Sequence, residues 1–191
     1  MEIKLMEIPS FRILSMRTSV EKGKDLVAAC ACNDLLTLQK SASLERSGIP
    51  GLSGLSLLYG NWPALDPDDI VVEEGLILDQ NIILRDKIAS LVDVNISGFG
   101  LSISYTPGGL YAVTRVQGPY SKLGTAYRMI LKDWLQENPF EYAGGPMLEL
   151  YINAAESIDE VEILTDVCCP VTPHGGGGSW HSISVFRTLF A

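Results

Sequence analysis

The residues best placed for chemistry in this sequence are polar side chains that alternate with aliphatic ones. The polar residues are Glu149, Tyr151 and Asn153, and the aliphatic ones are Leu148, Leu150 and Ile152. Successive side chains of a β-strand point to opposite faces of the sheet. This run therefore predicts a half-buried strand whose polar face carries an acid beside a phenol.

A carboxylate in that position has two chemical uses and one plain alternative. If Glu149 is partly desolvated against aromatic rings, it attracts an organic cation, and cation–π attraction adds roughly 0.5–2 kcal/mol. If burial raises its pKa instead, Glu149 can act as a general acid or base near neutral pH. The plain alternative is an exposed glutamate on the solvated face of a sheet.

An earlier segment repeats this pattern. Residues 57–61, Leu-Leu-Tyr-Gly-Asn, match residues 149–153 at the leucine, the tyrosine and the asparagine. Both runs are surrounded by the same predicted order of strand, helix, strand and strand, which favours one duplicated, pseudo-twofold domain. Tyr59 corresponds to Tyr151 in this alignment, so both are expected to face the side that Glu149 faces. A leucine takes the place of the acid in the first unit, so we expect one central carboxylate.

Two further aromatic residues are candidates for the same site. Trp62 begins a connector rich in proline and aspartate, and an exposed loop tryptophan is costly enough to suggest a contact with a ligand or partner. Tyr111 lies near the start of a strand predicted over 110–116 and is a candidate for the wall of a cleft. Packing at the edge of the sheet is the alternative for Tyr59 and Tyr151.

Hydrophobic periodicity and the proline and glycine breaks outline the elements that must position these residues. Strands are expected over 2–8, 11–17, 55–60, 70–78, 110–116, 146–153 and 161–171, and helices over about 18–39 and 120–137. A single domain is expected over 1–172, with pseudo-repeats at about 8–78 and 109–171 and a crossover over 79–108. Residues 173–191 include four glycines and a serine, as in engineered linkers, and are expected to form a flexible linker and tail.

Composition excludes several classes of protein. A chain of 191 residues, 47% hydrophobic and 19% charged, suits one globular domain. The net charge of −9 argues against direct nucleic-acid binding and is compatible with cationic ligands. No stretch approaches the ~20 apolar residues that a membrane span needs. The N-terminus lacks the pattern of a signal peptide, so a cytoplasmic protein is expected.

We expect no cofactor and no metal. The cysteines, Cys30, Cys32, Cys168 and Cys169, lack Cys-x-x-Cys spacing, and the two histidines, His174 and His181, both lie in or beside the tail. The sequence contains neither a phosphate-binding loop nor a Gly-x-Ser-x-Gly motif. The cysteines are expected to be small apolar residues in a reducing compartment.

A set of motifs in the second unit resembles a known family. The motifs are Gly109-Leu110-Tyr111-Ala112-Val113, Gly118-Pro119-Tyr120, Tyr127, Trp134-Leu135, Glu149-x-Tyr151-x-Asn153 and Cys169-Pro170-Val171. In order and spacing they are similar to the GyrI-like small-molecule-binding domains, relatives of the effector-binding domains of AraC- and MerR-type regulators and of SOUL-like proteins.

The resemblance implies an α+β fold in which duplicated βαββ units form a curved antiparallel sheet, with two main helices and a central ligand cleft. It implies that Glu149 is the central ligand-contacting carboxylate. The first functional hypothesis is therefore binding of bulky aromatic or cationic small molecules, for effector sensing or drug sequestration. One alternative is a hydrolase of reactive DNA-alkylating natural products that uses Glu149 as general base. Another alternative is a protein-binding module like the gyrase inhibitors.

Overall fold

The fold is that of a computed structural model, which describes residues 1–19, 54–62, 70–77, 101–153 and 159–175. Within these ranges, nine strands form the sheet: β1 Ile3–Ile8, β2 Arg12–Ser19, β3 Gly54–Tyr59, β4 Val71–Ile77, β5 Leu101–Tyr105, β6 Gly109–Gln117, β7 Phe140–Tyr142, β8 Met147–Tyr151 and β9 Leu164–Pro173. The order along the main path is β1-β6-β9-β8-β3-β4-β2-β5, and β7 pairs with β9. Every pairing is antiparallel.

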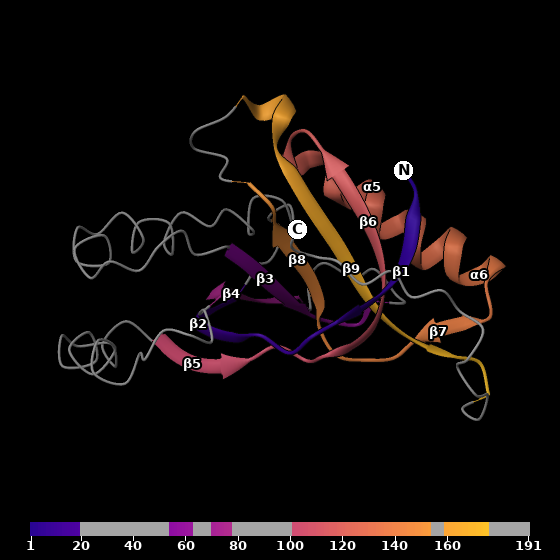
Figure 1. Cartoon of the computed structure of the whole chain (residues 1–191), viewed down its shortest axis with the longest axis horizontal. Helices are drawn as coiled ribbons and strands as arrows, with labels where there is room; N and C mark the ends of the chain where they lie inside the picture. The colour runs from indigo at the N-terminus through magenta and orange to yellow at the C-terminus, as the bar shows by residue number, and fades with distance from the viewer. Residues whose placement is uncertain (20–53, 63–69, 78–100, 154–158, 176–191) are drawn as a thin grey trace.

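The strand order is the same when read outward from the middle of the sheet in either direction. The central pair is β3 and β8, and beyond it each half continues with β4 and β2, or with β9 and β6. The outermost strands are exchanged, because β1 pairs with β6 of the second half and β5 pairs with β2 of the first. The exchange places a strand from each half at the edge of the other (Figure 1).

One long helical segment lies against β6 and β9 (Figure 1). It runs through four parts: the 3₁₀ turn η4 Tyr120–Lys122, the helix α5 Leu123–Arg128, the π-helix η5 Met129–Trp134 and the helix α6 Leu135–Glu137. The chain leaves β6 at Gly118, whose φ of 111° suits glycine. The helical segment ends at Asn138, whose side-chain amide donates to the carbonyl of Trp134.

The two faces of the sheet carry different apolar clusters. The helix-side cluster contains Leu58, Val72, Ala112, Val116, Met147 and Val167, with Leu123, Ala126, Tyr127 and Ile130 of the helical segment. The opposite-face cluster contains Ile8, Ile13, Leu55, Leu57, Tyr111, Val113, Leu148 and Leu150. Alternation along each strand divides the residues between the clusters, as expected for side chains with a period of two.

The antiparallel sheet and the helix expected over about 120–137 are confirmed. The expected helix over 18–39 lies almost wholly outside the described residues, and so does most of the crossover over 79–108. Within that crossover, β5 is a strand that the pattern of the sequence did not predict. The short strand β7, between the helical segment and β8, was not predicted either. No helix in the described part of the chain is long and apolar enough to cross a membrane.

Candidate functional site

Glu149 lies in the middle of β8 and at the middle of the sheet. Its side chain is 1% exposed, although it is a carboxylate. It pairs with Ser56 of β3 on one side and with Val167 of β9 on the other. Val167 belongs to the helix-side cluster, so the carboxyl group of Glu149 lies between the sheet and the helical segment.

Two tyrosine hydroxyls donate to this carboxyl group. Tyr127, on α5, donates to Oε1. Tyr151, two residues further along β8 and on the same face, donates to Oε2 at 3.0 Å. The hydroxyl of Tyr151 also lies 2.8 Å from Oγ of Ser56. One carboxyl group is thus held by phenols from a helix and from a strand.

Aromatic rings surround these polar atoms. Trp62 stacks on Tyr127, with ring centroids 5.0 Å apart and an interplanar angle of 25°. The indole nitrogen of Trp62 donates to the carbonyl of Leu58 at 2.8 Å, which holds the ring over β3. Tyr120 meets Tyr151 edge to face at 5.7 Å. Such a setting is suited to an organic cation, since each ring presents a negative face.

Burial raises the pKa of Glu149 above that of an ordinary glutamate. The two hydrogen bonds from the tyrosines oppose this rise, because a donor stabilises the charged form, but loss of hydration is the larger effect. The described partners of Glu149 are neutral phenols rather than cations. The site therefore contains a carboxyl group that lacks full compensation for a negative charge.

A glycine makes room for the Tyr151 ring. A Cβ atom on Gly54 would lie 3.2 Å from Cδ2 of Tyr151, closer than most Cβ contacts. Gly54 begins β3, which pairs with β8, so the ring lies over the backbone of the neighbouring strand. From that position the Tyr151 hydroxyl reaches both Ser56 and Glu149.

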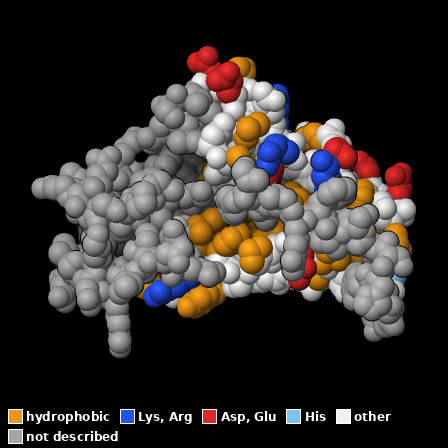
Figure 2. All heavy atoms as spheres, in the orientation of Figure 1, with side chains coloured by type: hydrophobic (Ala, Val, Ile, Leu, Met, Phe, Trp, Pro, Cys, Tyr) orange, Lys and Arg blue, Asp and Glu red, His pale blue; other side chains and the backbone are white. Residues whose placement is uncertain are grey.

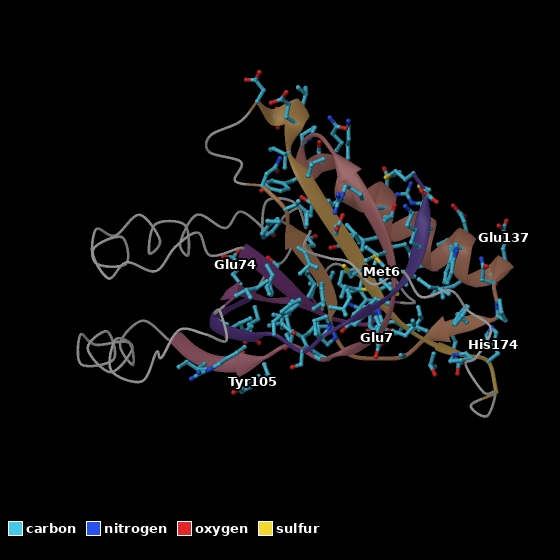
Figure 3. All side chains as sticks on the ribbon, in the orientation of Figure 1. Met6, Glu7, Glu74, Tyr105, Glu137 and His174 are labelled. Carbon is cyan, nitrogen blue, oxygen red and sulfur yellow. The ribbon has the colours of Figure 1, made fainter. Side chains whose placement is uncertain are left out.

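The polar row continues across the sheet beyond Ser56. Ser56 pairs with Glu74 of β4, which is 3% exposed and lies on the same face because paired residues share a face. Figure 3 labels Glu74 beside β3 and β4. On the other side of β8, Thr165 of β9 pairs with Tyr151. By contrast, acidic side chains in view on the surface gather at the tip that η6 Glu160–Glu162 forms and beside the end of the helical segment (Figure 2).

Two of the tyrosines expected near Glu149 lie on the opposite face of the sheet. Tyr59 packs against the opposite-face cluster and donates to Glu73 at 3.1 Å. Tyr111 belongs to that cluster and donates to the carbonyl of Pro107 at 2.9 Å. For Tyr59 the reason is register. Ser56 shares the face of Glu149 because the two residues pair in the ladder, and Tyr59, three residues from Ser56, lies on the other face.

Tyr151 does contact Glu149, and Trp62 stacks on Tyr127, which contacts Glu149. Trp62 is 2% exposed, however, and does not lie on an open loop. Sequence reasoning did not assign Tyr127, Tyr120 and Ser56 to the site. Tyr127 lies on the apolar stripe of its helix, where the pattern predicts a core residue. The only sequence feature that pointed to Tyr127 was its place among the motifs of the family resemblance. Asn153 has a structural role, because it bridges Glu162 and Leu164 at the end of β8.

The opposite face has polar groups of its own. Ser15 donates to Glu73 at 2.6 Å and Ser104 donates to it at 3.0 Å. Arg115 donates two hydrogen bonds, both of 2.7 Å, to Asp166, which is buried. No cluster of His, Cys, Asp or Glu in the described ranges is arranged to hold a metal ion.

The family resemblance is confirmed by comparison with known proteins. Residues 79–172 match the family described as GyrI-like small molecule binding domain. No curated protein is similar enough in sequence to add to this match.

Solved structures share the fold at low identity. The C-terminal domain of EcmrR has a TM-score of 0.62 and 19% identity, covering 90% of this chain and 98% of that one. An uncharacterized conserved protein from Listeria innocua has a TM-score of 0.60 and 12% identity, with coverage of 90% and 92%. SAV2435 bound to tetraphenylphosphonium has a TM-score of 0.54 and 15% identity, with coverage of 90% and 94%. At these identities the likeness establishes the fold alone.

Proposed function

We propose that this chain, whose residues 79–172 match the GyrI-like small molecule binding domains, binds bulky aromatic or cationic small molecules with Glu149 as the central carboxylate. The site lies between β8 and the helical segment. Tyr127, Tyr151 and Trp62 supply its aromatic walls. The bound molecule serves effector sensing or drug sequestration.

The burial of Glu149 among neutral partners is the observation that carries this proposal. An uncompensated charge in a poorly hydrated site is costly, and a cation placed beside it removes that cost. Glu149 is 1% exposed, so the side chains around it must move to admit a cation. Affinity therefore depends on the cation interacting with Glu149 strongly enough to offset the cost of that rearrangement.

The proposed class of ligand is the one found with a protein of the same fold. SAV2435 was solved with tetraphenylphosphonium, an aromatic cation, and the EcmrR domain is part of a protein solved in complex with DNA. This chain covers 57% of the EcmrR chain in that complex. We keep the prediction that this chain makes no direct contact with nucleic acid, and that it works in the cytoplasm.

The test is binding of tetraphenylphosphonium, followed by tryptophan fluorescence, because Trp62 stacks on Tyr127. The natural sequence should show saturable quenching. Glu149→Gln should weaken binding at least about tenfold, because the charge is lost while the shape is kept. Glu160→Gln, an exposed acid on η6, is the matched control and should stay within about twofold. Equal binding by the Glu149→Gln variant would remove Glu149 from the site.

A hydrolase of reactive, ring-strained natural products is the second candidate. The observation that favours it is the raised pKa of a carboxyl group beside a phenol, since such a group can accept a proton from water near neutral pH. A hydrolase from Listeria innocua shares the fold, with a TM-score of 0.58 and 10% identity. Tyr151 would orient the substrate. Turnover of a strained electrophile, detected by mass spectrometry and abolished in Glu149→Gln, would establish this activity.

A further inference from the structure

In the part of the chain that the structure describes, one buried hydroxyl on the Glu149 face of the sheet has no hydrogen-bond partner. Thr165 is 1% exposed, and its Oγ1 atom makes no hydrogen bond. A buried hydroxyl without a partner is destabilising, and nearly all such groups in native proteins find one. An orphan of this kind beside a binding site therefore requires an explanation.

Thr165 lies close to the partly exposed end of the site. It pairs with Tyr151 across the β8–β9 ladder and with Val116 across the β9–β6 ladder. Residues that pair in an antiparallel ladder share a face, so Thr165 lies on the side of the sheet that carries Glu149. Tyr151 and Tyr120, which meet edge to face, are both half-buried, whereas Glu149 is enclosed. Thr165 is therefore a neighbour of the tyrosine pair at the less buried end of the site.

Glu149 retains capacity for further donors. A carboxylate offers about four lone-pair positions on its two oxygens. The described contacts use one position on each oxygen, for Tyr127 and for Tyr151. A ligand that carries several N–H groups can bind the free positions and also donate to a nearby hydroxyl oxygen. A cation without N–H groups can do neither.

We propose that Oγ1 of Thr165 accepts a hydrogen bond from the bound cation, so that the site prefers aromatic cations with N–H groups. Protonated amines, amidiniums and guanidiniums attached to an aromatic body form this class. Quaternary ammonium and phosphonium ions are bound by charge and rings alone. This inference rests on the proposed function, because it requires a cation at Glu149.

Thr114 shows what a purely structural threonine looks like on the same face. It lies on β6 and pairs with Val167 of β9, it is 1% exposed, and its hydroxyl donates to the carbonyl of Glu2 at 2.9 Å. Thr165 has the same burial without that bond. The two residues therefore form a matched pair for substitution by valine, which keeps the shape and removes the hydroxyl.

The experiment compares biphenylmethylammonium with its N,N,N-trimethyl analogue, by calorimetry, on four versions of the full chain. The versions are the natural sequence, Thr165→Val, Thr114→Val and Glu149→Gln. The measured quantity is the ratio of the two dissociation constants, because it cancels general effects on folding. Thr165→Val should reduce the preference for the primary ammonium about tenfold. Thr114→Val should leave the ratio within about twofold, and Glu149→Gln should weaken both cations.

The outcomes separate the two proposals. If Glu149→Gln weakens both cations but Thr165→Val leaves the ratio unchanged, the role of Thr165 is wrong and the proposed function stands. If neither cation binds the natural sequence, both proposals fail. Thr165→Ser, which keeps the hydroxyl, is the second variant and should retain the preference. Loss of the preference in Thr165→Ser as well would attribute it to shape and overturn the inference.

Discussion

At the scale of single residues, Glu149 is where burial and charge conflict. Its carboxyl group is enclosed between β8 and α5, and the hydrogen bonds described for it come from the phenols of Tyr127 and Tyr151. A core side chain of the same volume would avoid that conflict, and functional sites often retain such destabilising groups. Its cost in stability can be measured.

Glu149→Gln should stabilise the empty protein at neutral and higher pH. Burial raises the pKa of Glu149, so the folded protein holds this proton more tightly than the unfolded chain does. That contribution is complete below the unfolded-state pKa and is lost as the pH rises through the raised folded-state pKa. Glutamine cannot titrate, so the variant should unfold about 2–4 °C higher than the natural sequence at about pH 8. Thermal unfolding followed by circular dichroism checks this.

Near about pH 4 the two proteins should unfold at similar temperatures, because Glu149 is then protonated in both states. Glu160→Gln supplies the control for a change of net charge. A gap between Glu149→Gln and the natural sequence that widened as the pH fell would show that the sign of the pKa change is wrong.

Tyr111→Phe should leave cation binding unchanged and lower stability. Tyr111 lies on the face opposite to Glu149, and its hydroxyl donates to the carbonyl of Pro107. Removing that bond should reduce the free energy of unfolding by about 1 kcal/mol. Urea unfolding and the fluorescence titration with tetraphenylphosphonium measure the two effects. A tenfold loss of affinity would instead place Tyr111 in the site.

At the scale of elements, the helical segment carries one half of the site and β8 carries the other. The helical segment starts after the break at Gly118-Pro119, and its part α5 packs on β6 and β9. This packing brings the hydroxyl of Tyr127 to Glu149. The π-helix η5 follows directly after α5. Stretches of this kind occur frequently near functional sites.

Two glycine-to-alanine substitutions in and beside this segment should change the stability of the protein in opposite directions. Gly124 lies within α5, and a Cβ there would meet no atom within 4 Å, so Gly124→Ala should stabilise the protein by about 0.5–1 kcal/mol. Gly118 has a φ of 111°, which side chains rarely adopt, so Gly118→Ala should destabilise it. Chemical denaturation measures both. If both variants changed stability in the same direction, the start of the helix would differ from that described.

At the scale of the whole molecule, the sheet is held together by contacts between its two halves. At the centre of the sheet, β8 is hydrogen-bonded to β3. At the edges, each half is hydrogen-bonded to a strand of the other half, since β1 pairs with β6 and β5 pairs with β2. Glu149 lies beside the central seam. The site therefore requires both halves, although the family match covers only residues 79–172.

A fragment of residues 79–172 should not fold as a cooperative monomer. It would lack β3 beside β8, β2 beside β5 and β1 beside β6, leaving three strands with exposed edges. Size-exclusion chromatography and thermal unfolding of the fragment, compared with the full chain, test this. A monomeric fragment with a sharp unfolding transition would show that the second half is an independent unit.

Much of the site could be predicted from local pattern. Strict alternation over 148–153 placed Glu149 and Tyr151 on one face, and the helix over about 120–137 followed from its apolar stripe. The environment of Glu149 could not be predicted in this way. Tyr127 was noted only as part of the family motifs and was given no role in the site. Thr165 was not noted at all, because the lack of a hydrogen-bond partner depends on the surroundings of a residue and not on its local sequence.

The sequence by itself determined which residues share a face of one strand or helix, since side-chain periodicity is a local property of the backbone. Only the tertiary structure decided which faces meet. The alignment of the two units made Leu57 and Tyr59 equivalent to Glu149 and Tyr151, which implied one shared face. The ladder pairs Ser56 with Glu149, so Leu57 and Tyr59 lie on the opposite face and the alignment of the two units was wrong by one residue. Register depends on the packing of distant elements, and no local pattern specifies it.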